Sequence, residues 1–121
     1  MGDLSKHFNR YEFACRDGCG FDTVDAELIK VLEDLRERFN SSVIINSGCR
    51  CALHNAEVGG SKGSMHLKGK AADARVKGVD ADTVAEYLLE KYPNKYGIGR
   101  YKGRTHIDVR KEPARWDKRG G

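Results

Sequence analysis

The chain is 121 residues long and carries a formal net charge of +4, with 39% hydrophobic and 33% charged residues. This size and composition are ordinary for one globular domain spanning residues 1–121. No apolar run approaches the roughly eighteen residues of a membrane span, and the mild positive charge is as typical of a solvated surface as of one that attracts acidic partners.

The first half of the chain predicts a helical turn, a long helix and a strand. Asn9–Phe13 is typical of a short turn capped by its first residue. Apolar residues at helical spacing predict a helix over Thr23–Asn40, with Asp22 or Thr23 as its cap. The short β-branched segment Ser42–Asn46 predicts a strand.

The second half predicts two helices, three strands and a tail. In chain order these are a helix at 51–58, a strand at 71–76, a helix at 80–92 and strands at 96–101 and 105–110. A turn at Lys102-Gly103 makes the last two strands a hairpin, and we expect the basic residues 113–121 to be flexible. This order predicts an α+β fold with a small, mainly antiparallel sheet flanked by helices.

Two segments carry side chains suited to metal binding. His66 lies in a polar loop, whereas Asp73 lies in an apolar predicted strand, where an ionised carboxylate is costly unless a cation compensates it. His106 and Asp108 are two residues apart in a predicted strand and therefore share a face. Taken alone, each of these features is as typical of an ordinary polar strand surface as of a metal site. Together, His66, Asp73 and His106 form a three-ligand set that leaves zinc a fourth position for water.

Two further residues are candidates for catalysis. Asp108, beside the metal, could take a proton from the bound water and deliver it to the leaving amine. Arg50 could stabilise the developing oxyanion or bind a substrate carboxylate, although a plain surface role fits it equally well.

The pattern around these residues resembles a known family. Its motif S-x-H-x-x-G-x-A-x-D is matched at every fixed position by Ser64, His66, Gly69, Ala71 and Asp73, and His106 is similar to its later histidine. Ser47-Gly48-Cys49-Arg50, His54–Gly60, Gly97–Tyr101 and Arg115-Trp116 extend the likeness over roughly residues 8–116. The chain thus resembles the zinc D-alanyl-D-alanine carboxypeptidase family of LAS metallopeptidases, with the hedgehog/DD-peptidase fold, and especially its small phage-type branch.

The resemblance implies one catalytic Zn²⁺ and hydrolysis of peptide bonds in peptidoglycan stem peptides or cross-links. The activity would be of the DD-carboxypeptidase, endopeptidase or L-alanyl-D-glutamate peptidase type, in an endolysin or a wall-remodelling enzyme. Many members place an acid three residues before the last histidine, where this chain has Gly103, so the base role moves to Asp108. His54 is outside the metal pattern and is expected to be structural. Trp116 is expected to pack in the core, with a position over the cleft as the alternative.

We expect a monomer that binds peptidoglycan peptides, binds no nucleic acid and does not insert into membranes. No secretory signal is visible in residues 1–8, so the protein would be cytoplasmic at synthesis and act on the wall after release or export. Two alternatives remain open. One is a non-catalytic, zinc-containing binding module of the same fold, and the other is a nucleic-acid binder built on a four-cysteine zinc site.

The four cysteines form two close pairs, Cys15/Cys19 and Cys49/Cys51. Reduced thiols, disulfides and a second, structural zinc site are all compatible with these spacings, since C-x₃-C is common for zinc but C-x-C is tight. The sequence leaves the three possibilities open.

Overall fold

The computed structural model describes residues 4–16, 18–20, 22–59 and 64–118. Its helices are α1 (Ala26–Phe39), α2 (Ala52–Glu57) and α3 (Ala81–Lys91), with 3₁₀ turns η1 (Arg10–Phe13) and η2 (Met65–Lys68). Its strands are β1 (Val43–Ser47), β2 (Ala71–Val76), β3 (Gly97–Tyr101), β4 (Arg104–Asp108) and β5 (Ala114–Asp117). Gly60, which ends one family-like stretch, and residues 61–63 lie outside the described residues.

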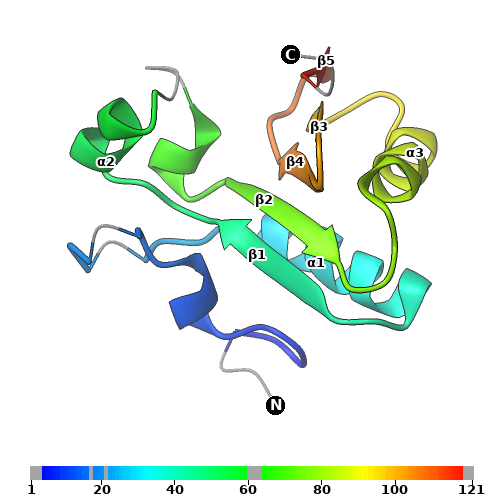
Figure 1. Cartoon of the computed structure of the whole chain (residues 1–121), viewed down its shortest axis with the longest axis horizontal. Helices are drawn as coiled ribbons and strands as arrows, with labels where there is room; N and C mark the ends of the chain where they lie inside the picture. Colours follow the sequence, from blue (N-terminus) through cyan, green and yellow to red (C-terminus); the bar gives the residue numbers. More distant parts are fainter. Residues whose placement is uncertain (1–3, 17, 21, 60–63, 119–121) are drawn as a thin grey trace.

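The strands form one five-stranded sheet in the order β1-β2-β4-β3-β5 (Figure 1). All neighbouring strands are antiparallel except β5, which runs parallel to β3. The predicted α+β class with a mainly antiparallel sheet is therefore confirmed. None of the helices formed by the described residues is long and apolar enough to cross a bilayer.

Helix α1 begins later than its apolar pattern predicts. The side chain of Asp25 accepts a hydrogen bond from the backbone N–H of Glu27 and so caps the helix at Ala26, not at Thr23. At the other end Asn40 adopts a left-handed conformation, with φ of 47°, and stops the helix. The predicted caps Asp22 and Thr23 are wrong, because Asp25 competes for the first free N–H groups.

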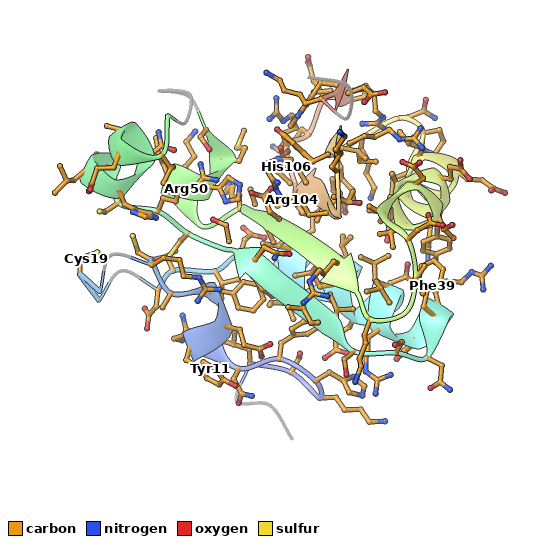
Figure 2. The ribbon with its side chains drawn as sticks, viewed as in Figure 1. Tyr11, Cys19, Phe39, Arg50, Arg104 and His106 are labelled. Carbon is orange, nitrogen blue, oxygen red and sulfur yellow. The ribbon has the colours of Figure 1, made fainter. Side chains whose placement is uncertain are left out.

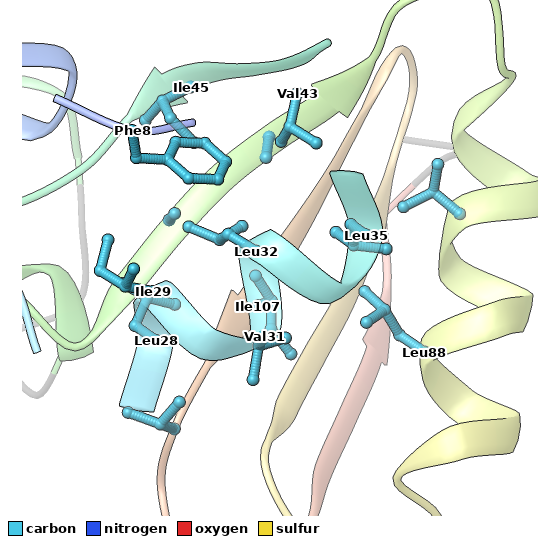
Figure 3. Close-up of a cluster of buried hydrophobic side chains, with 14 of the residues drawn as sticks. Phe8, Leu28, Ile29, Val31, Leu32, Leu35, Val43, Ile45, Leu88 and Ile107 are labelled. Atoms are coloured by element: carbon cyan, nitrogen blue, oxygen red, sulfur yellow. The ribbon is translucent and has the colours of Figure 1, made fainter. Parts of the chain in front are cut away.

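The two faces of the sheet differ in chemistry. Ala72 and Ala74 of β2 and Ile107 of β4 point into one core with α1 and α3 (Figure 3). The core side chains of α1 are Leu28, Ile29, Val31, Leu32 and Leu35, and α3 adds Val84 and Leu88. Because side chains alternate along a strand, the intervening residues Asp73 and His106 face the opposite side. The apolar core thus fixes which side chains the other face carries.

The predicted hairpin turn is confirmed, whereas the prediction for the C-terminal tail is wrong in part. Tyr101 pairs with Arg104 across Lys102 and Gly103, as predicted for a two-residue turn. The prediction that residues from 113 onward are flexible is wrong for Ala114–Asp117, which form β5 along the free edge of β3. Residues 119–121 of the predicted tail lie outside the described residues. The edge pairing depends on a distant strand, which local sequence patterns do not reveal.

Candidate metal centre

Three buried side chains converge on the polar face of the sheet. His66 comes from η2, Asp73 from β2 and His106 from β4, and their ligand atoms all lie within 4.8 Å of one another. His66 Nε2 is 3.5 Å from Asp73 Oδ1, and His106 Nδ1 is 3.1 Å from the same oxygen. The structure therefore brings together the three residues predicted to bind zinc.

The hydrogen bonding of His66 fixes which nitrogen faces its neighbours. Its Nδ1 lies 2.5 Å from the carbonyl oxygen of Gly48, and because a carbonyl can only accept, Nδ1 must carry the proton. The lone pair is then on Nε2, which is buried and has no hydrogen-bond partner among the described residues. An unpaired buried lone pair is costly. A cation beside Asp73 would satisfy it.

His106 is oriented from behind by Asp108. Its Nε2 lies 2.7 Å from Asp108 Oδ2, while Nδ1 points toward Asp73. Burial lowers the pKa of His106, but hydrogen bonds to Asp108 and Asp73 outweigh burial and raise it. The pocket thus favours a positive charge between His106 Nδ1 and Asp73, which either a proton or a metal ion can supply.

Asp73 is held in its ionised form. Burial alone would raise its pKa, but the hydrogen bond with His106 and the electrostatic attraction of the two adjacent imidazoles outweigh burial and keep the pKa well below its usual range. Two neutral imidazoles and one carboxylate form a donor set that fits zinc, with a fourth position available. The orphaned His66 Nε2 and the ionised Asp73 are the features that this fit explains.

The surroundings of Asp108 do not support its predicted role as the base. Its side chain is 0% exposed, and it does not line the cleft above the three ligands. Its oxygens accept hydrogen bonds from the backbone N–H groups of Gly97 and Arg110 and from the guanidinium of Arg110, at 2.8–3.2 Å. With His106 added, this geometry makes Asp108 a positioning residue that orients the imidazole.

Arg50 lies beside the ligand set, as expected of a substrate-binding or oxyanion-stabilising group. Its Nη2 is 3.5 Å from Asp73 Oδ2, and its Nη1 donates to Asn55 Oδ1 at 3.1 Å. Its backbone N–H donates to the carbonyl oxygen of His66 at 2.9 Å, which ties the Arg50 turn directly to η2. The guanidinium is therefore positioned by Asn55 of α2 and Asp73 of β2, whereas η2 holds the Arg50 main chain.

A cleft of about 520 Å³ opens over the three ligands. Figure 2 shows Arg50, Arg104 and His106 gathered in the same part of the molecule, and all three line this cleft. Arg110 and Lys118 add further positive charge, whereas Asp73 is the sole carboxylate among the described lining residues. The cleft is therefore a positively charged surface around one buried anion.

Trp116 belongs to this cleft, and its predicted core role is wrong. It is half-buried, its ring centroid lies 4.8 Å from that of His106, and its Nε1 donates to the hydroxyl of Tyr101 at 2.9 Å. Sequence reasoning missed Tyr101 as a site residue and offered the cleft only as the alternative position for Trp116. The only local signal was the pair of glycines in Gly97–Tyr101, because a strand that keeps glycine at alternate positions leaves room on one face.

Those two glycines create space for site residues. A Cβ on Gly97 would lie 2.3 Å from Asp108 Oδ2, and a Cβ on Gly99 would lie 2.3 Å from Trp116 Nε1. Both distances are far shorter than carbon atoms tolerate. The absence of a side chain at Gly97 leaves room for the Asp108 carboxylate, and its absence at Gly99 leaves room for the Trp116 indole. Both groups contact His106. His54 lies in α2, outside the ligand set.

A family model described as peptidase M15 matches residues 6–108 of the chain, which include the ligand set, Arg50 and Asp108. The chain belongs to the peptidase M15 family. No curated protein matches the chain at a significant level. Membership of this family identifies a zinc peptidase, and the M15 chain presents the donors for such an ion at His66, Asp73 and His106.

Proposed function

We propose that this M15 peptidase hydrolyses peptide bonds in the stem peptides or cross-links of bacterial peptidoglycan. One observation carries the proposal: His66 Nε2, buried and without a hydrogen-bond partner among the described residues, faces Asp73 together with His106 Nδ1. A donor set of this composition suits catalytic zinc, because three protein ligands leave a position for water. When bound, zinc supplies a Lewis acid and lowers the pKa of its water to about 7.

The chain's own residues prepare this site for hydrolysis. Gly48 and Asp108 accept the N–H protons of His66 and His106, so each ring presents its lone pair to the centre. Arg50 lines the cleft, and its Nη2 lies 3.5 Å from Asp73 Oδ2. We assign Arg50 to the substrate, either at the carbonyl oxygen that becomes an oxyanion or at a carboxylate.

The charge of the cleft supports a peptidoglycan substrate. Stem peptides carry free carboxylates, and a cleft lined by Arg50, Arg104 and Lys118 would attract them. Trp116 offers an apolar surface beside His106 against which a peptide can pack. Within this proposal the reaction is of the DD-carboxypeptidase, endopeptidase or L-alanyl-D-glutamate peptidase type, carried out by a monomer after release or export to the wall, in endolysis or wall remodelling.

Digestion of purified peptidoglycan, followed by mass spectrometry of the released peptides, tests this function. The zinc-loaded protein should release stem-peptide fragments, and the fragment masses identify the bond. Asp73→Asn should abolish release, whereas Asp82→Asn, a matched change of an exposed carboxylate on α3, should leave it intact. Zinc-loaded protein that releases nothing from walls of several compositions would contradict the proposal.

A second candidate is a zinc-containing binding module without catalysis. It is favoured by the cleft itself, since Asp73 is its sole described carboxylate and Gly103 stands where related chains place an acid. Saturable binding of zinc-loaded protein to peptidoglycan without any released peptide would establish the binding module. Multiple turnover on the same material would exclude it.

A further inference from the structure

Three cysteine sulfurs converge at a place separate from the histidine centre. Cys15 follows η1, Cys19 lies one turn further along the chain, and Cys51 immediately precedes α2. Their sulfur atoms all lie within 4.8 Å of one another. Figure 2 shows Cys19 at the edge of the molecule, apart from Arg50 and His106. None of these cysteines is needed for the proposed hydrolysis.

The spacing of the sulfurs fits a tetrahedral metal ion better than a disulfide. Cys15 Sγ and Cys51 Sγ are 3.9 Å apart. Two thiolates on one tetrahedral zinc, each at about 2.3 Å, lie roughly 3.8 Å apart. A disulfide requires about 2.05 Å and joins only two sulfurs. A bond between any two of these cysteines would therefore leave the third beside it without a covalent role.

Backbone N–H groups already point at two of the sulfurs. The N–H of Cys51 donates to Cys15 Sγ at 3.4 Å, and the N–H of His54 donates to Cys51 Sγ at 3.4 Å. Hydrogen bonds of this kind commonly orient metal ligands from outside the coordination shell. The carbonyl oxygen of Cys15 accepts from the N–H of Gly18 at 3.2 Å, and Cys19 is the next residue along the chain.

We infer that Cys15, Cys19 and Cys51 bind a second zinc ion as thiolates, in a structural site. Each thiol releases its proton to solvent as the metal binds. Cys49, which sequence spacing grouped with the other three, is outside the set of converging sulfurs. It is buried, and its backbone N–H donates to the carbonyl oxygen of Phe13 at 2.9 Å.

The position of this site gives it a structural purpose. Cys51 directly follows Arg50, so an ion held between Cys51 and the Cys15–Cys19 turn would fasten the segment after η1 to the turn that carries Arg50. The described links there are a few hydrogen bonds, such as the one from Cys49 to Phe13. Since structural zinc contributes directly to folding free energy, the ion would stabilise this corner of the fold.

Zinc counting in variants separates the two sites. Wild-type protein should hold about two zinc ions per chain, and His106→Ala, which removes a histidine ligand, should hold about one. Cys19→Ala is the matched change, because Cys19 is exposed and its loss leaves no hole in the core. It should also hold about one, and the double variant about none. Equal zinc content in wild type and Cys19→Ala would overturn the inference.

Cobalt substitution identifies the ligands independently of activity. In the His106→Ala background, cobalt should give the intense near-ultraviolet band of thiolate-to-metal charge transfer. The band should vanish on adding Cys19→Ala and persist on adding Cys49→Ala. A chelator should lower the thermal unfolding midpoint of His106→Ala but not of the double variant. Absence of the band, its loss with Cys49→Ala, or two thiols missing from a titration of denatured, unreduced protein would each overturn the assignment.

Discussion

Asp73 and His106 are direct partners across the antiparallel β2–β4 ladder, and Nδ1 of the imidazole lies 3.1 Å from Oδ1 of the carboxylate. Opposed residues of such a ladder have Cβ atoms about 5 Å apart. Strand pairing alone therefore brings two ligands within reach of one ion. Two residues further along β4, Asp108 pairs with Gly97 of β3, so one strand carries both His106 and the group that orients it.

The paired variants Asp108→Asn and Asp108→Ala distinguish a positioning role from a base role. Asn keeps an acceptor oxygen for His106 Nε2–H but cannot take a proton, whereas Ala removes both functions. We expect Asp108→Ala to weaken zinc binding by about 10- to 100-fold and to lower stability by about 3 kcal/mol, since Arg110 is left without its buried partner. Zinc titration and urea unfolding measure the two effects.

Asp108→Asn should retain most of the zinc affinity and, with zinc saturating, most of the turnover. Peptidoglycan hydrolysis at saturating zinc is the deciding measurement. If both variants bind zinc normally and neither turns over, Asp108 is the base after all, and the positioning role is wrong.

Much of the site follows from local sequence, for identifiable reasons. The alternation of side chains places His106 and Asp108 on one face of β4, and a carboxylate among alanines identifies Asp73. The His66 environment depends on a contact with Gly48 across 18 residues of chain, and strand propensity contains no information on such a contact. The role of Asp108 changes partly for the same reason, since Gly97 of β3 meets it only when β3 and β4 pair, whereas Arg110 lies only two residues along the chain.

The fold likewise has elements that local sequence predicts and elements that depend on contacts between distant parts of the chain. Helices α1 and α3 and strand β2 follow from the periodicity and composition of their side chains, because those signals lie within each segment. Strand β5 has four residues and gains its hydrogen bonds from β3, so the isolated segment resembles a tail. Trp116 was misassigned with it, since its contact with His106 exists only once β5 has docked.

Gly99→Ala should displace Trp116, because the new methyl group would lie 2.3 Å from its Nε1. We expect a loss of about 1–3 kcal/mol in unfolding free energy, typical of overpacking. Zinc affinity should stay unchanged, while KM for peptidoglycan fragments rises. Trp116→Ala removes the obstacle, so the double variant should lose less stability than the sum of the single changes. Strict additivity in urea unfolding would show that the indole does not occupy this space.

Glu33 on α1 should make stability fall in acid. It accepts hydrogen bonds from the Ser5 hydroxyl and from both the backbone N–H and the ring Nδ1 of His7. Burial raises the pKa of Glu33, but these hydrogen bonds and the charge of His7 outweigh burial and lower the pKa below 4.5. Stability from a depressed carboxyl pKa is present above the unfolded value and is lost as pH falls through the folded value.

Glu33→Gln should therefore be less stable than wild type at neutral pH, and the difference should shrink as pH falls below about 4.5. Unfolding free energies measured by urea at a series of pH values give both curves. Other buried acids contribute equally to wild type and variant, so the difference isolates Glu33. Glu37→Gln, a change of an exposed carboxylate on the same helix, is the control and should follow the wild-type curve. Parallel curves for Glu33→Gln would refute the linkage.

Kinetics of the variants Arg50→Lys and Arg50→Ala distinguish which part of the substrate the guanidinium contacts. Lys keeps the positive charge but cannot donate to both Asn55 and the cleft in the fixed fork of Arg. If Arg50 stabilises the oxyanion, Arg50→Ala should lower kcat by about 10²- to 10³-fold with little change in KM. If it binds a substrate carboxylate, KM should rise instead, and Lys should restore much of the affinity.

The same comparison on peptides with a free or an amidated carboxylate separates the two roles a second way. Loss of discrimination between these peptides in Arg50→Ala, with kcat retained, would assign Arg50 to the carboxylate. Unchanged discrimination with a collapsed kcat would assign it to the oxyanion. Zinc content must be matched throughout, because Arg50 lies 3.5 Å from Asp73 and its removal also alters the charge around a metal ligand. A variant with wild-type kcat and KM would exclude Arg50 from the chemistry and leave it the role of tying its turn to η2.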